Sequence, residues 1–223
     1  MPQLTTKNTI HGVPSTHATG DAYRIDPKAS LFTVRAFAGG LISAAAHNPE
    51  FAIRDFTGDI RFDASSPNES ALALWIRSGF FELTNDVSAQ DRQVIQHVMN
   101  DEVLEVQQYP EISFVSSRVT VEQLFESMFR AEVAGQLTLH GTTLSLGITA
   151  QLVLGNDTLR ATGDFTIRQS DFGLKIATVA GGTLKVRDEL RFCFYVLARR
   201  IPQLAEDPVT AKTGQTTGSS ILH

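Results

Sequence analysis

Long stretches of this sequence alternate between apolar and polar residues, and this two-residue period predicts β-strands with one buried face. The clearest case is segment 144–154, where every even-numbered residue is apolar while Ser145, Thr149 and Gln151 lie between them. We predict seven further strands, at 30–38, 51–63, 70–77, 111–121, 131–139, 159–167 and 184–196. The pattern argues against a predominantly helical fold.

Turn residues separate the later strands and favour antiparallel hairpins. His140-Gly141-Thr142 joins two predicted strands, and Gly155-Asn156-Asp157 joins the next pair. A sheet of about eight strands with one apolar face must cover that face and protect its edges. Closing on itself achieves both, and an eight-stranded barrel has room inside for side chains or one small ligand. We therefore predict an all-β fold, an eight-stranded antiparallel β-barrel.

One segment departs from the two-residue period and predicts a helical insert. Ser88 and Asp91 have the spacing of a capping box, which favours a helix starting after Ser88. Asn100 is expected to cap a second helical piece. The insert could close one end of the barrel, or its apolar stripe could simply pack on the sheet. The stripe consists of Val94, Ile95, Val98 and Met99.

Composition narrows the class of protein. The 223 residues carry a formal net charge of −5, so no overall basic field attracts nucleic acid. A single cysteine, Cys193, excludes an intramolecular disulfide framework. No apolar run approaches the ~20 residues of a spanning helix, and no secretion signal is evident. We expect a cytoplasmic protein with one barrel domain over 21–202, between flexible tails at 1–20 and 203–223.

Phenylalanine dominates the apolar faces of the predicted strands. The chain has 14 Phe but only one Trp and three Tyr, so its aromatic area is almost purely apolar. Such an inner face either packs solid or surrounds an apolar tunnel, and periodicity alone favours solid packing. The inward positions are Phe56, Ile60, Phe62, Leu74, Ile76, Phe114, Leu137, Ile148, Phe165 and Phe192.

His47 is the histidine that we consider as a candidate functional residue. It follows a run of small residues, 43–46, and precedes a predicted strand. Its ring nitrogens could hold the bend by hydrogen bonds. Alternatively, His47 could lie at the barrel mouth and form an acid–base pair with Asp55 or Asp171 on a hydrophobic substrate. No metal-ligand, phosphate-loop or nucleophile motif accompanies it.

Five motifs follow one another along the chain: Y-R-I-D-P at 23–27, F-T-G-D-I-R-F-D at 56–63, Y-P-E-I-S-F at 109–114, G-Q-L-T-L-H-G at 135–141 and S-D-F-G at 170–173. Taken in order, they resemble the YceI-like family of lipocalin-like, polyisoprenoid-binding proteins. Gln169 stands where the family has an arginine before Ser-Asp-Phe-Gly.

The resemblance implies a lipocalin-like barrel that holds a long apolar ligand and performs no catalysis. It favours the tunnel over the solid core. The ten expected ligand-binding residues are then His47, Phe56, Phe62, Ile76, Phe114, Leu137, Ile148, Phe165, Phe172 and Phe192. A polyisoprenoid or a quinone-like lipid would be the bound molecule, with no other cofactor and no metal. The chain could also form a homodimer.

Overall fold

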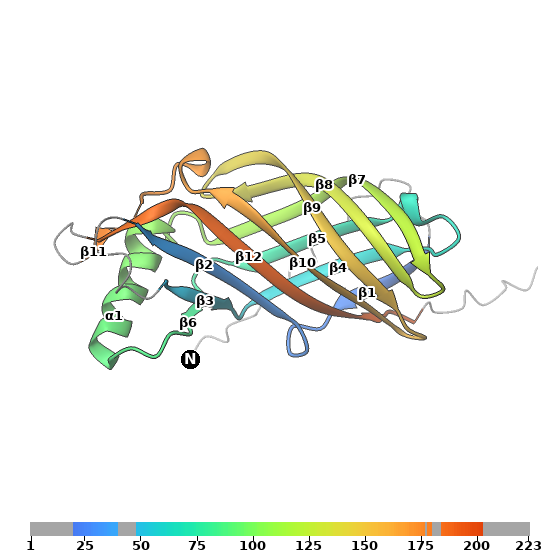
Figure 1. Cartoon of the computed structure of the whole chain (residues 1–223), viewed down its shortest axis with the longest axis horizontal. Coiled ribbons are helices and arrows are strands. Elements are labelled where there is room, and N and C mark those ends of the chain that lie inside the picture. The colour runs from blue at the N-terminus through green and yellow to red at the C-terminus, as the bar shows by residue number, and fades with distance from the viewer. Residues whose placement is uncertain (1–19, 40–47, 177, 180–183, 203–223) are drawn as a thin grey trace, which may run out of the picture.

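The computed structural model describes residues 20–39, 48–176, 178–179 and 184–202, and their strands wrap into one barrel (Figure 1). The predicted tails lie outside the described residues, apart from Gly20. The strands are β1 (Asp21–Ile25), β2 (Leu31–Gly39), β3 (Glu50–Ile53), β4 (Phe56–Phe62), β5 (Ala71–Arg77), β6 (Phe81–Leu83), β7 (Glu111–Phe125), β8 (Met128–Leu139), β9 (Thr142–Leu154), β10 (Thr158–Arg168), β11 (Thr178–Val179) and β12 (Leu184–Arg200). The helical elements are η1 (Pro67–Glu69), α1 (Ala89–His97), η2 (Val98–Val103) and η3 (Ser170–Phe172).

Eight strand positions close the barrel. Around the wall the paired order is β1, β4, β5, β7, β8, β9, β10 and β12, and β12 pairs back to β1. Three of these positions each hold two strands in series, because β2 continues β1, β3 continues β4 and β6 continues β5. The continuing strands lie toward the end that carries α1 (Figure 1). This arrangement confirms the predicted all-β, eight-stranded antiparallel barrel with a helical insert.

The predicted strand 51–63 is wrong in one respect, because it is broken into β3 and β4 at Arg54 and Asp55. The Arg54 amide donates to the Phe80 carbonyl at 3.0 Å, and the Asp55 carbonyl accepts from the Arg77 amide at 3.0 Å. These contacts join the break to the matching break between β5 and β6. The wall therefore bends at both positions together.

The hairpin predicted at His140-Gly141-Thr142 is present between β8 and β9, and its turn has two residues, His140 and Gly141. His140 has φ 50° and Gly141 has φ 73°, the pair of left-handed residues that a type I′ hairpin turn requires. Glycine takes this conformation freely, whereas His140 adopts it at a cost. The hairpin thus holds His140 in a fixed position at the barrel end.

Two inward glycines make room for aromatic rings on neighbouring strands. A Cβ at Gly135 on β8 would lie 2.5 Å from Cζ of Phe114 on β7. A Cβ at Gly163 on β10 would lie 2.6 Å from Cζ of Phe194 on β12. Each ring therefore lies over a glycine. The absence of a side chain at these two glycines makes room for the rings on the inner surface of the barrel.

Helix α1 begins as predicted, at the Ser88 cap. The Ser88 hydroxyl accepts from the Asp91 amide at 3.0 Å and donates to the Asp91 carboxylate at 2.7 Å. The predicted cap at Asn100 is wrong. The helix continues without a break into the π-helical turn η2, so Asn100 lies inside helical backbone.

Side chains of α1 satisfy backbone carbonyls of β6 and the residues that follow it. The Arg92 guanidinium donates to the carbonyls of Leu83 and Asn85, the latter at 2.8 Å. The Gln96 amide donates to the Phe81 carbonyl at 2.5 Å. The edge of β6 is thereby covered by helix α1 rather than by another strand.

Candidate functional site

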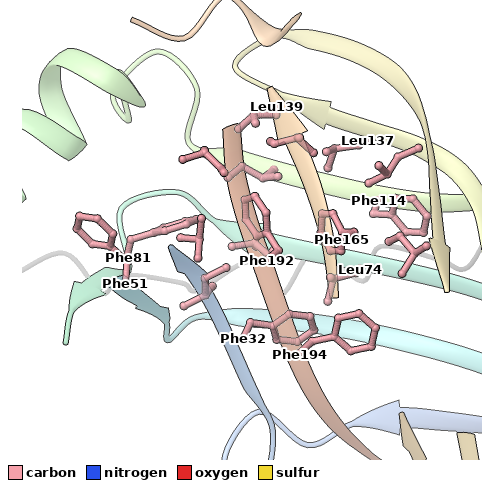
Figure 2. A pocket seen from close by; sticks show the side chains of 18 of the residues that line it. Phe32, Phe51, Leu74, Phe81, Phe114, Leu137, Leu139, Phe165, Phe192 and Phe194 are labelled. Atoms are coloured by element: carbon pink, nitrogen blue, oxygen red, sulfur yellow. The ribbon is translucent and has the colours of Figure 1, made fainter. Parts of the chain in front are cut away.

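The barrel encloses a cavity of about 890 Å³. Its wall is almost entirely apolar and draws on most of the strands and on the helical insert. Figure 2 shows phenylalanine and leucine side chains from several strands converging on this space. A volume of this size is in the range of natural small-molecule sites.

Seven of the ten predicted site residues line the cavity: Phe62, Ile76, Phe114, Leu137, Ile148, Phe165 and Phe192. Phe56 and Phe172 are buried, with 3% and 4% of their surfaces exposed, but neither is among the lining residues. Phe56 packs edge-on against Phe32, with ring centroids 4.9 Å apart. His47 lies outside the described residues.

The aromatic residues of the wall pack against one another and leave one side facing the cavity. Phe165 and Phe192 stack with ring centroids 5.0 Å apart and planes 2° apart. Phe32 and Phe194 stack at 6.0 Å. Phe165, Phe192 and Phe194 are only half-buried, although their side chains point into the barrel. Their free faces provide an apolar surface for a ligand.

The helical insert closes one end of the cavity. Val94, Ile95, Val98 and Met99, the stripe seen in the sequence, all belong to the lining. Ile95, Val98 and Met99 also pack against the hydrophobic core, whereas Val94 remains 53% exposed. The insert therefore acts as a cover for the barrel end, one of the two roles left open by the sequence.

Several lining residues escape the sequence prediction. Phe32, Phe51 and Phe81 lie on β2, β3 and β6, and all three line the cavity. The strands β3 and β6 have four and three residues, too few for a clear period. Phe32, by contrast, could have been found from its alternation with Val34 in the predicted strand 30–38.

A few polar side chains interrupt the apolar lining. Gln169 is 3% exposed, and its amide donates to the Arg187 carbonyl at 2.8 Å. Asp91 also belongs to the lining, and its carboxylate accepts the Ser88 hydroxyl. Ser70 and Ser113 are the other polar members. The site can thus accommodate one small polar group on a mainly apolar molecule.

The residues of the acid–base alternative are not gathered at the cavity. Asp55 forms an ion pair with Arg77 at 3.2 Å, and Asp171 is exposed. Neither carboxylate belongs to the lining. Among the described residues, no group of three or more His, Cys, Asp or Glu side chains is placed to hold a metal ion.

Glu105 joins three segments at one end of the barrel. Its carboxylate lies 2.7 Å from Nε2 of His140 and 3.0 Å from Nζ of Lys175. The hydrogen bonds from Lys175 and then from His140 hold the pKa of the Glu105 carboxyl below its ordinary value. The residues just before these three, Leu104, Leu139 and Leu174, all line the cavity. The polar cluster thus lies directly outside the apolar wall.

Comparison with known proteins places the chain in a family. The model of the YceI-like domain matches residues 23–198, so the chain belongs to the YceI-like family. A UPF0312 protein of Pseudomonas savastanoi pv. phaseolicola is 30% identical over 130 residues, which are 55% of this chain and 62% of the relative. The match therefore spans less than two thirds of that relative's length.

Solved structures share the fold. Burkholderia cenocepacia BcnA superposes with a TM-score of 0.61 at 18% identity, covering 78% of this chain and 98% of that one. A polyisoprenoid binding domain from Saccharophagus degradans superposes with a TM-score of 0.58 at 15% identity, covering 81% and 99%. In the described residues, no helix is long and apolar enough to cross a membrane.

Proposed function

We propose that this chain binds a long apolar molecule, a polyisoprenoid or a similar lipid, inside the barrel and holds it without transforming it. The observation that carries the proposal is the cavity of about 890 Å³ with its nearly continuous apolar lining. Membership of the YceI-like family supports it. So does the shared fold of a polyisoprenoid binding domain.

The energetics favour a chain-like ligand. Each buried CH₂ contributes roughly 0.8 kcal/mol, so ~20 buried carbons would contribute on the order of 16 kcal/mol before the cost of association. The binding free energy would thus come from length rather than from polar contacts. This matches a lining in which the polar side chains are Gln169, Asp91, Ser70 and Ser113.

A lipid with one modest polar end, such as a quinone-like lipid, belongs to the same proposal. Gln169 on the β10 side and Asp91 on α1 are two polar groups that such an end could reach from the cavity. The carboxylate of Asp91 would accept a hydrogen bond, whereas it would repel a phosphate. The proposal therefore favours an uncharged end group.

Location and assembly are the remaining parts of the proposal. A cytoplasmic location agrees with a single, exposed cysteine, Cys193, which needs no oxidising compartment. A homodimer would let two barrels act together. Cell fractionation tests the location, and mass photometry across a range of protein concentrations tests the dimer.

Filling the cavity tests the binding proposal. Ala161 lines the cavity and is 8% exposed, so Ala161→Phe should occupy ligand space. Ala134 lies exposed on β8, and Ala134→Phe adds the same group outside. Titration with cis-parinaric acid, whose fluorescence rises in apolar surroundings, should give saturable binding in the parent and Ala134→Phe but at least tenfold weaker binding in Ala161→Phe. Equal binding by all three proteins would refute an internal site.

A further inference from the structure

The barrel wall contains a seam between β9 and β10. The two strands pair only from Leu159↔Leu154 to Asp164↔Thr149. Beyond that point β9 still pairs with β8 back to Thr142, and β10 still pairs with β12 as far as Arg168. In the described part of the chain, residues 142–148 of β9 have a strand partner on one edge only. Figure 1 shows β9 arching away from β10 over this stretch.

Both sides of the seam belong to the cavity wall. Leu146 and Ile148 on β9 line the cavity, as do Phe165 and Ile167 on β10. Leu144, the next residue of the same face of β9, is 36% exposed. Apolar side chains therefore continue from the cavity to the outside along this line, without a backbone ladder between them.

Side chains, rather than backbone pairing, hold the end of the seam that lies near the start of β9 and the end of β10. His140 lies in the turn before β9, and Lys175 lies beyond η3, which follows β10. Glu105 contacts both, at 2.7 Å and 3.0 Å. The ring of Tyr109 packs 4.2 Å from that of His140. Glu105 thus links the β9 side of the seam to the β10 side.

We propose that the apolar ligand enters and leaves the cavity sideways through the seam between β9 and β10, which the contacts of Glu105 with His140 and Lys175 hold closed. The proposal rests on the proposed lipid-binding function. Widening the seam breaks no ladder between residues 142–148 and β10. Opening the end beneath α1 instead breaks the hydrogen bonds from Arg92 and Gln96 to the β6 segment. The seam is therefore the less costly route.

A gate changes rates without changing affinity, because it lies on the path of both uptake and release. Stopped-flow mixing with cis-parinaric acid measures both rates. Lys175→Met keeps the length of the side chain but loses the contact with Glu105. We expect the association and dissociation rates to rise by the same factor, about two- to fivefold as for the loss of an exposed ion pair, with Kd unchanged. Lys28→Met, at the exposed turn between β1 and β2, is the matched control and should change neither rate.

Cross-linking the seam gives the opposite test. Extending the β9–β10 register beyond Asp164↔Thr149 would place Gly147 opposite Thr166. A Cβ at Gly147 would meet no atom within 4 Å. In a Cys193→Ser background, Gly147→Cys with Thr166→Cys, joined by a short bismaleimide, should slow uptake and release at least tenfold. The control pair is Gln151→Cys with Thr162→Cys, which are already register partners on exposed positions, and its cross-link should alter neither rate.

The outcomes separate the two proposals. If the parent does not bind cis-parinaric acid, the proposed function fails. If the parent binds but Lys175→Met and the cross-linked seam exchange ligand at the parental rates, the seam is wrong. Faster ligand exchange in Arg92→Met, with parental rates in the seam variants, would place the route beneath α1 and would also overturn the proposed seam. A changed Kd in Lys175→Met would make Lys175 a ligand contact instead of part of a gate.

Discussion

The rings of Phe165 on β10 and Phe192 on β12 lie parallel, with centroids 5.0 Å apart, and both border the cavity. Stacked rings contribute beyond their buried area. Each ring here is nevertheless only half-buried. The stack is therefore part of a wall and not of a solid core, which determines how the protein should respond to its removal.

Phe165→Ala should cost less than a typical core truncation. A closely packed Phe replaced by Ala loses about 3–5 kcal/mol of unfolding free energy. Phe165 already borders empty space, so we expect a loss of about 2 kcal/mol or less. The enlarged cavity should also accept bulkier ligands. Urea unfolding measures the first effect, and competition between chains of different width measures the second.

Phe129 supplies the matched comparison. It is 1% exposed, lies edge-on to Phe62 at 5.3 Å and does not line the cavity. Phe129→Ala should therefore show the full loss of about 3–5 kcal/mol. Thr166→Ala, on the exposed face of β10, should change neither stability nor ligand choice. Equal losses for Phe165→Ala and Phe129→Ala would indicate a solid core.

Arg92→Met should loosen the helical cover. The substitution removes the hydrogen bonds to the Leu83 and Asn85 carbonyls, and bonds to a charged donor contribute about 1.5–3 kcal/mol each. We expect faster hydrogen exchange in α1 and β6, with little change in β7 to β10. Arg54→Met removes an exposed ion pair with Glu82 and should leave exchange in α1 unchanged. An increase in hydrogen exchange of the same size in all strands of the barrel would contradict a separately held cover.

The Glu105 cluster predicts a pH dependence of stability. Lys175 and then His140 lower the pKa of the Glu105 carboxyl from its ordinary value of about 4.5. A lowered folded-state pKa means that the stabilisation is present above about pH 4.5 and is lost as the pH falls through the lowered value.

Thermal unfolding from pH 7 to pH 3 can isolate this contribution. The parent should melt above Glu105→Gln at pH 7, and the difference should shrink below about pH 4.5. Carboxyls outside the cluster, such as Asp26 and Asp188, also have a lowered pKa. They are present in both proteins and cancel in the comparison. A difference that stays constant with pH would exclude an electrostatic role for Glu105.

Much of the barrel could be predicted from the sequence because long strands repeat their period several times. The segments 131–139, 144–154 and 159–167 correspond to β8, β9 and β10 within a few residues. The break at Arg54 and Asp55 could not be predicted, because it depends on hydrogen bonds to Arg77 and Phe80, residues distant in the chain. The short strands β1 and β6 likewise depend on their pairing partners and not on a pattern of their own.

The candidate site was accessible from sequence to the extent that it follows the strand period. Phe165 and Phe192 face inward for the same reason that the strands form. The hollow interior itself does not follow from alternation, since a solid core and a cavity have the same pattern. Gln169 also differs from the pattern: its position is set by bonds to the Arg187 and Asp188 carbonyls, at an irregular part of β12.

The most direct test of the central claim is native mass spectrometry of the protein purified without detergent from its own host. We expect a non-covalent complex with a lipid of defined mass in the parent, and loss of that lipid in Ala161→Phe but not in Ala134→Phe. The lipid should be recovered chemically unchanged after prolonged incubation. A parent that appears only at its bare mass, and that takes up no polyprenol or quinone added in excess, would contradict an internal lipid site.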